Sequence, residues 1–179
     1  YRKHAENHEG TPEGKIAARR SAPNGLLGWA SLVANGPSAN RIDVVVMGDG
    51  YTLTKQDDFE KISEDRAREV VEVNFFGTFN LCQEALDPLK VRGGSIVVIT
   101  SVHAESAYAG SSIYNFTKAG LNQFAATLGL ELAKYRIRVN ALEPGWVRTP
   151  GSTGGMSLEE IAHAEQHTIP WGRMGQPAD

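Results

Sequence analysis

Cysteine is nearly absent from this sequence of 179 residues: Cys82 is the only one, so no disulfide can form within the chain. A reducing, cytoplasmic setting is the simplest interpretation of such cysteine usage. The sequence also lacks any run of about 18 apolar residues, the length needed to span a bilayer. It does not open with a charged and then apolar signal segment. We therefore expect no membrane partner.

Neither sign of charge dominates the composition. The 18 Lys and Arg residues stand against 21 Asp and Glu residues, which gives a formal net charge of −3. This balance argues against a surface dedicated to nucleic acid, and we expect no nucleic-acid partner. The hydrophobic fraction of 41% and the charged fraction of 22% are typical of a globular protein. The length allows one domain with a substantial core.

Residues 1–40 carry no regular apolar pattern. Glycine and proline recur through this polar region, and residues 26–33 form its only short apolar stretch. This composition predicts an irregular or poorly ordered segment with at most one short helix. The folded part is then expected over residues 41–179.

From residue 41 onward, apolar residues gather in short runs and in helical stripes. Short runs rich in β-branched residues predict buried strands at 42–47, 95–100 and 136–142. Apolar residues at helical spacing predict helices at 63–89, 112–135 and 157–166. Strands and helices that alternate at such lengths form parallel βαβ units. We expect a Rossmann-like α/β fold, a doubly wound parallel sheet whose ligands bind at the carboxyl ends of the strands.

Four polar residues stand at positions where this fold would bring them together. Tyr114 and Lys118 lie one turn apart on a predicted helix, and an ammonium at that range favours the phenolate form of the tyrosine. Such a tyrosine can give a proton to a carbonyl oxygen or take one from an alcohol. Ser101 follows a predicted strand and can hold the same substrate oxygen. Asn74 lies within an apolar-rich helix, where its amide can anchor a water that relays protons.

Each of these residues also has an ordinary structural interpretation. A tyrosine and a lysine at this spacing often mark the flank of a helix, a serine after a strand is commonly a cap, and an asparagine in a helix is commonly at the surface. The functional interpretation depends on all four occurring at the expected strand end and helix faces.

The motifs of residues 66–179 resemble the second half of a short-chain dehydrogenase/reductase, in the family's order and spacing. The matching pieces are VNFFGTF at 73–79, ITSV at 99–102, YNFTKAG at 114–120, IRVN at 137–140, EPGWVRTP at 143–150 and IPWGRMGQP at 169–177. The resemblance implies an oxidoreductase that transfers a hydride between NAD or NADP and a small-molecule alcohol/carbonyl substrate. It also implies a homo-oligomer that assembles through the helices at 63–89 and 112–135.

The same resemblance assigns roles to individual residues. Tyr114 would be the general acid/base, Ser101 would steady the reacting oxygen, and Asn74 would hold the relay water. Lys118 would stabilise the phenolate and bind the nicotinamide ribose, so that Tyr114 and Lys118 also belong to the cofactor site. The loop residues that would line the nicotinamide are Pro144, Gly145, Val147 and Thr149.

One hallmark of the family is missing from this sequence. The first half of the family carries a TGxxxGxG turn that cradles the cofactor's pyrophosphate. Here the sequence offers only Gly48-Asp49-Gly50, a short GxG pattern. We therefore expect the domain to lack the N-terminal nucleotide-binding half. The alternative hypothesis is a truncated or fused fragment without cofactor binding or activity, acting at most as an oligomerisation module.

A second, shorter resemblance involves residues 35–52, which are similar to the opening strand of IgA-peptidase-type metallopeptidases. A protease of that kind needs a His-Glu-x-x-His helix to bind zinc. His163 and His167 have the required spacing, but the glutamate between them, Glu165, is in the wrong place. We expect a solvated helix face at these histidines and no metal site.

Overall fold

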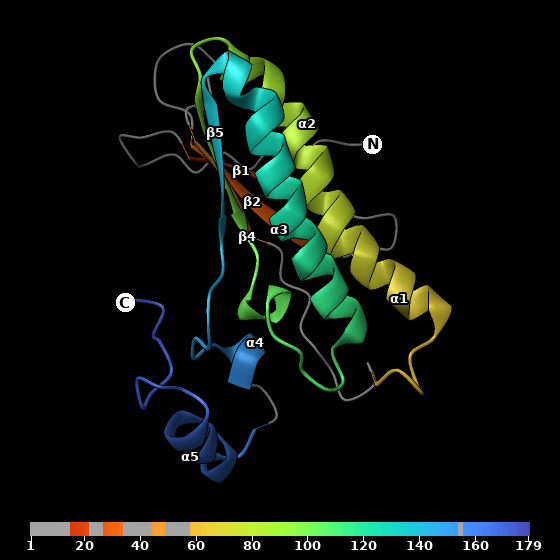
Figure 1. Cartoon of the computed structure of the whole chain (residues 1–179), viewed down its shortest axis with the longest axis vertical. Coiled ribbons are helices and arrows are strands. Elements are labelled where there is room, and N and C mark those ends of the chain that lie inside the picture. Colours follow the sequence, from red (N-terminus) through yellow and green to blue (C-terminus); the bar gives the residue numbers. More distant parts are fainter. Residues whose placement is uncertain (1–14, 22–26, 34–43, 49–57, 154–155) are drawn as a thin grey trace. The chain divides into compact units, whose positions relative to one another are not determined.

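The computed structural model describes residues 15–21, 27–33, 44–48, 58–153 and 156–179 (Figure 1). Contacts within the chain divide it into two compact units, Tyr1–Glu143 and Pro144–Asp179. In the part of the chain that is described, none of the helices is long and apolar enough to cross a membrane.

The first unit is built on a five-stranded sheet with the strand order β1-β2-β3-β4-β5. The strands are β1 (Lys15–Ser21), β2 (Leu27–Val33), β3 (Val44–Gly48), β4 (Gly94–Ile99) and β5 (Ile137–Leu142). The last three strands pair in parallel, and β1 and β2 join them in antiparallel register. The parallel strands predicted from the sequence are therefore confirmed, within a sheet that is mixed as a whole.

Strands β1 and β2 correct the expectation for residues 1–40. The sequence predicted an irregular segment with at most a short helix at 26–33, but residues 27–33 form a strand that pairs with residues 15–21. The overlooked signal is Pro23-Asn24-Gly25, since these residue types between two short segments favour a turn that joins a hairpin. The other residues of this region lie outside the described part of the chain.

Two long helical stretches connect the parallel strands. The first comprises α1 (Glu64–Val71), one π-helical turn η1 (Glu72–Phe76) and α2 (Gly77–Lys90). The second is α3 (Ser112–Leu132), which a 3₁₀ turn, η3 (Ala133–Tyr135), extends. Parallel crossovers are right-handed, and both cross the sheet in the same direction, so α2 and α3 cover the same face. Figure 1 shows these two helices side by side.

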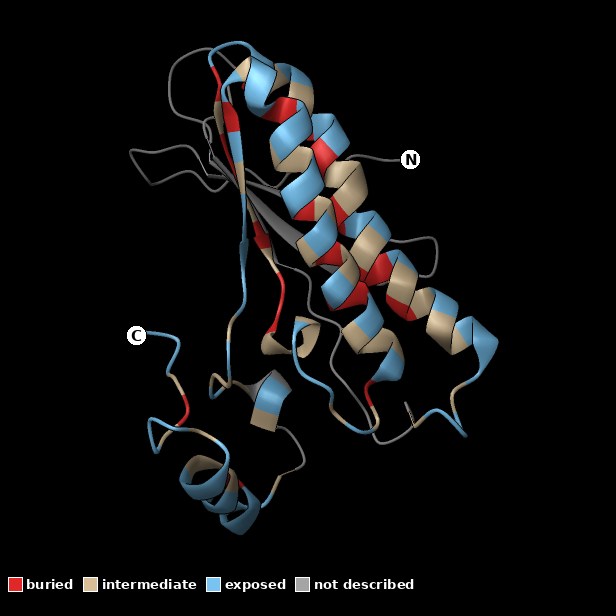
Figure 2. Cartoon of the chain, in the orientation of Figure 1, coloured by how far each residue is buried: buried red, intermediate tan, exposed pale blue. Residues whose placement is uncertain are grey.

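The core of the first unit lies between these helices and β4 and β5. Leu89 of α2, Ile96 of β4 and Leu121 of α3 are fully buried. Figure 2 shows the buried positions of α2 and α3 along the line where the two helices meet. Burial also raises the pKa of the Cys82 thiol to about 12, which excludes this cysteine as a nucleophile at neutral pH.

A close backbone approach fixes the turn between α2 and β4. Gly93 has a φ of +84°, and a Cβ there would lie 2.6 Å from the carbonyl oxygen of Arg136. Gly94 donates a hydrogen bond to the same carbonyl over 3.3 Å. Glycine is therefore required at position 93 to set the start of β4 beside β5.

The second unit contains α4 (Pro150–Thr153) and α5 (Leu158–His167). Ser157 caps α5, and its side chain and that of Glu160 each accept a hydrogen bond from the other's backbone N–H. The helix predicted at 157–166 is thus confirmed to within one residue at each end.

Candidate active site

Ser101 lies directly beyond the carboxyl end of β4. Thr100 holds this strand end to β5, because its backbone N–H and its hydroxyl both donate to the carbonyl oxygen of Leu142, over 2.7 and 3.2 Å. Ser101 is buried and accepts a hydrogen bond from the backbone N–H of His103 over 3.2 Å. The serine thus caps the short turn η2 (Val102–Ala104). Its hydroxyl hydrogen can still be donated to a substrate oxygen.

Tyr114 and Lys118 lie on consecutive turns near the start of α3. The Lys118 Nζ atom lies 5.5 Å from the centroid of the Tyr114 ring. Lys118 is almost fully buried, and its Nζ donates to the carbonyl oxygen of Ile99 over 3.3 Å. The lysine therefore connects the end of β4 to the tyrosine.

Asn74 occupies the π-helical turn between α1 and α2 and is completely buried. Its Nδ2 donates to the Thr117 hydroxyl over 3.1 Å, and that hydroxyl donates to the carbonyl oxygen of Tyr114 over 2.7 Å. The Asn74 Oδ1 atom is buried and has no hydrogen-bond partner among the described residues. Isolated π-helical turns often occur at functional sites. A buried acceptor without a partner is a natural place for an ordered water.

The structure links three of the four residues that the sequence singled out as a proton-handling group. Asn74 reaches the backbone carbonyl of Tyr114 through Thr117, and Lys118 lies beside the Tyr114 ring and bonds to Ile99 at the end of β4. Ser101 follows that strand two residues after Ile99.

Sequence reasoning missed two residues at this site, Thr117 and His103. The His103 ring packs edge-to-face against the Tyr114 ring, with a centroid distance of 5.1 Å and an interplanar angle of 85°. The sequence signal for His103 is its position two residues after Ser101.

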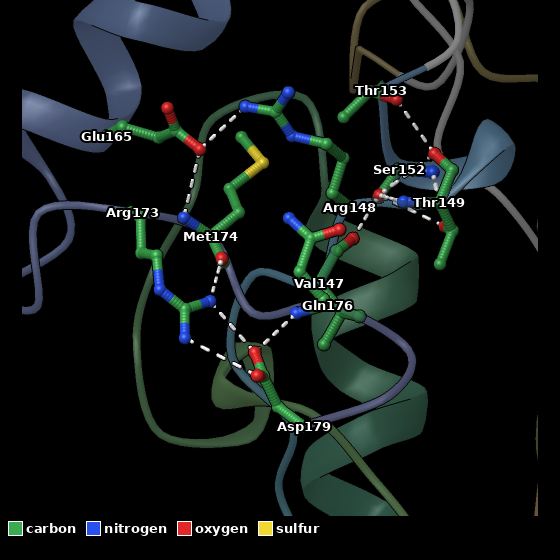
Figure 3. Close-up of polar contacts among 10 residues, drawn as sticks. All are labelled: Val147, Arg148, Thr149, Ser152, Thr153, Glu165, Arg173, Met174, Gln176 and Asp179. Atoms are coloured by element: carbon green, nitrogen blue, oxygen red, sulfur yellow. Dashed lines mark hydrogen bonds and ion pairs between the residues drawn. The ribbon is translucent and has the colours of Figure 1, made fainter.

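The four loop residues expected to line a nicotinamide belong to the second unit. Pro144 and Gly145 begin it, and a Cβ added at Gly145 would meet nothing within 4 Å. Val147 forms a parallel bridge with Gly175. The Thr149 hydroxyl accepts a hydrogen bond from the backbone N–H of Ser152 over 3.1 Å, so it caps α4 (Figure 3).

Glu165 of α5 joins this loop to the segment that contains Met174 (Figure 3). Its carboxylate accepts hydrogen bonds from Arg148 over 2.8 Å and from the backbone N–H of Met174 over 3.0 Å. The Met174 bond, followed by the Arg148 bond, lowers the pKa of Glu165 below its ordinary value. The segment that contains Met174 and Gly175 is thereby attached to the loop that contains Val147 and Arg148.

The two histidines with zinc-ligand spacing face each other on α5. The rings of His163 and His167 stack with their centroids 4.2 Å apart, and His167 Nδ1 donates to the carbonyl oxygen of His163. Among the described residues, no group of three or more His, Cys, Asp or Glu side chains could hold a metal ion. Of the stretch 35–52 that resembles a metallopeptidase, residues 35–43 and 49–52 lie outside the described part of the chain.

Comparison with known proteins places these motifs in a family. A family model described as Enoyl-(Acyl carrier protein) reductase matches residues 30–179. A 3-oxoacyl-[acyl-carrier-protein] reductase of Aquifex aeolicus is 39% identical over 139 residues, which cover 77% of this chain and 54% of that protein. The chain therefore belongs to the short-chain dehydrogenase/reductase family, as its motifs indicate.

Solved structures give the same result. The crystal structure of a 3-oxoacyl-[acyl-carrier protein] reductase from Brucella melitensis matches with a TM-score of 0.69 and 33% identity, over 76% of this chain and 52% of that chain. A gluconate 5-dehydrogenase from Burkholderia cenocepacia, solved with NADP and tartrate, matches with a TM-score of 0.69 and 27% identity, over 76% and 53%. The Rossmann-like fold class is thereby confirmed. The chain spans about half the length of the relatives it matches.

Proposed function

We propose that this chain carries the catalytic centre of an oxidoreductase that transfers a hydride between NAD or NADP and a small-molecule alcohol/carbonyl substrate. The observation that carries the proposal is the link from Asn74 through Thr117 to Tyr114, with Lys118 beside the tyrosine ring and Ser101 at the adjoining strand end. Membership of an oxidoreductase family supports it.

The residues of the first unit fit the nicotinamide end of such a cofactor. Lys118 has an ammonium with three N–H donors at the end of β4. It can therefore donate a hydrogen bond to a ribose hydroxyl as well as to the Ile99 carbonyl oxygen. In the second unit, Pro144, Gly145, Val147 and Thr149 would line the nicotinamide. Bound NADH or NADPH would supply the hydride that a carbonyl carbon accepts.

The protein's part in the reaction is to handle the proton and orient the substrate. During reduction, the Ser101 hydroxyl donates a hydrogen bond to the carbonyl oxygen while Tyr114 transfers its phenolic proton to that same oxygen. The positive charge of Lys118 stabilises the phenolate that remains. A water on the Asn74 Oδ1 would pass a proton inward from solvent to restore the tyrosine.

Cofactor titration tests this proposal. Protein fluorescence with NADH and NADPH, followed by turnover of a panel of ketones, should show binding and reduction, and Lys118→Met should weaken the binding about tenfold or more by removing the donor to the ribose. Arg92→Met is a matched control, since Arg92 is exposed beyond α2. A folded chain that binds neither NADH nor NADPH would contradict the proposal.

The second candidate function is a fragment that does not bind cofactor and acts at most in oligomerisation. It predicts a folded chain that binds neither NADH nor NADPH. The observation in its favour is the missing TGxxxGxG turn, since backbone N–H groups of such a turn hold the pyrophosphate.

We also propose that the chain forms a homo-oligomer through α1–α2 and α3. Phe116 and Leu130 of α3 are 63% and 82% exposed, and Phe76, the last residue of η1, is 42% exposed. Apolar side chains spread along one helix face favour a second copy of the same face. Sedimentation analysis should show an oligomer that Leu130→Glu weakens, whereas Leu158→Glu on α5 should leave it intact. A monomer at all concentrations would contradict this assembly.

A further inference from the structure

His103 occupies a fixed position beside the proposed proton donor. Its ring stacks on Tyr108 with the centroids 4.0 Å apart, and it meets Tyr114 edge-to-face. Its backbone N–H donates to the Ser101 hydroxyl. One residue therefore contacts both Ser101 and Tyr114, and the two aromatic rings restrict its imidazole to a narrow range of orientations.

The hydrogen bonds of Asn115 determine which imidazole nitrogen carries the proton. The Asn115 Nδ2 donates to the carbonyl oxygen of Ser106 over 3.2 Å. A carbonyl only accepts, so the NH₂ side of the amide must face Ser106 and the Oδ1 side must face His103. The His103 Nδ1 lies 2.7 Å from that Oδ1 and must therefore be the protonated nitrogen. In the neutral imidazole, Nε2 is then a hydrogen-bond acceptor.

The Nε2 atom has no hydrogen-bond partner among the described residues, and the His103 side chain is half-buried. We infer that His103 is a specificity-determining residue, whose Nε2 accepts a hydrogen bond from a hydroxyl on the carbon next to the reacting one. The substrate class is then a vicinal diol or the corresponding α-hydroxy ketone. This inference rests on the proposed function, because it assumes that the substrate binds at Ser101 and Tyr114.

The physical reason for such selectivity is the cost of burying an acceptor without a donor. A substrate with a neighbouring hydroxyl satisfies Nε2, whereas a substrate with a methylene there displaces water from Nε2 and leaves it unsatisfied. Sites that hydrogen-bond a substrate hydroxyl strongly discriminate against analogues that lack it. We expect kcat/KM for 3-hydroxybutan-2-one to exceed that for butan-2-one by at least about tenfold.

Two substitutions of His103 distinguish the role of Nε2 from that of Nδ1. His103→Asn places an amide near Nδ1 and removes the group at Nε2, so the ratio of the two kcat/KM values should fall about tenfold. His103→Gln places an amide oxygen near Nε2 and should retain most of the preference. His163→Asn, on exposed α5, is the control and should leave the ratio unchanged. Equal kcat/KM values for the two substrates in the wild type would overturn the inference. The same ratio of these values in the wild type and in His103→Asn would also overturn it.

A binding measurement keeps this inference separate from the proposed function. In ¹⁵N-histidine-labelled protein, the His103 signals are assigned by their loss in His103→Asn, and in the neutral ring they should show the proton on Nδ1. Butane-2,3-diol should shift the Nε2 resonance and butan-2-ol should not. The same response to both alcohols, no response to either, or protonation at Nε2 in the neutral ring would overturn the inference. Absence of turnover with either cofactor would instead contradict the proposed function, and the NMR result would still decide the role of His103.

Discussion

The buried amide of Asn74 donates a hydrogen bond to the hydroxyl of Thr117, 43 residues further along the chain, over 3.1 Å. This bond joins the π-helical turn of one long helical stretch to the first turns of α3. Within the described residues, the Asn74 Oδ1 is left without a hydrogen-bond partner. The position of Asn74 therefore depends on a threonine that lies between Tyr114 and Lys118 in the sequence.

Thr117→Val tests the energy of this contact. Valine has the shape of threonine but no acceptor, so the buried Asn74 NH₂ group would lose its partner. We expect the free energy of unfolding to fall by about 1–3 kcal/mol, the cost of a buried donor left unsatisfied. Chemical denaturation measures the change. Thr127→Val on the exposed side of α3 should change stability by less than about 0.5 kcal/mol. Equal effects of the two substitutions would show that the Asn74 contact contributes nothing.

Gly93→Ala should destabilise the first unit. The φ of +84° costs an alanine about 1–3 kcal/mol, and its Cβ would also lie 2.6 Å from the Arg136 carbonyl oxygen. Gly120→Ala is the opposite case, because a Cβ there meets nothing within 4 Å and the residue lies inside α3. That substitution should stabilise the chain by about 0.5–1 kcal/mol. Thermal unfolding of both variants decides the point, and a stable Gly93→Ala protein would refute the close approach.

The second unit should lose stability in acid through Glu165. Hydrogen bonds from the Met174 N–H and from Arg148 lower the pKa of this carboxylate from its ordinary value of 4.5. A lowered pKa means that the stabilisation is complete above about pH 4.5 and is lost as the pH falls through the folded-state pKa. Wild type should therefore unfold at a higher temperature than Glu165→Gln at pH 7, and the difference should shrink below pH 4.5. A difference that is independent of pH would exclude a role for the carboxylate charge.

The elements that the sequence predicted well are those with a strong apolar pattern. Strand β4 carries a short apolar run and helix α3 carries a stripe of buried residues, and such patterns determine element type. Strand β1 was missed because Lys15–Ser21 contains a single β-branched residue, Ile16, and reads as polar. Its existence depends on pairing with β2, which no pattern within residues 15–21 reveals.

At the candidate site, too, some features could be predicted from the sequence and others could not. Tyr114, Lys118 and Ser101 could be selected because their spacing on a predicted helix and strand end limits where they lie. The π-helical turn at Asn74 could not be predicted, since it depends on one shift of the backbone hydrogen bonds within a continuous helical pattern. The pairing of His103 with Asn115 depends on how the turn after β4 folds back on α3.

The most direct test of the account is the rate of ketone reduction by Tyr114→Phe, measured beside the wild type at saturating NADH or NADPH. Phenylalanine keeps the ring that packs on His103 and near Lys118 but has no proton to give. We predict that kcat falls by at least about 100-fold, the usual contribution of a general acid, while the circular dichroism spectrum stays the same. Turnover by Tyr114→Phe at the wild-type rate would show that the proton comes from elsewhere and would contradict the account.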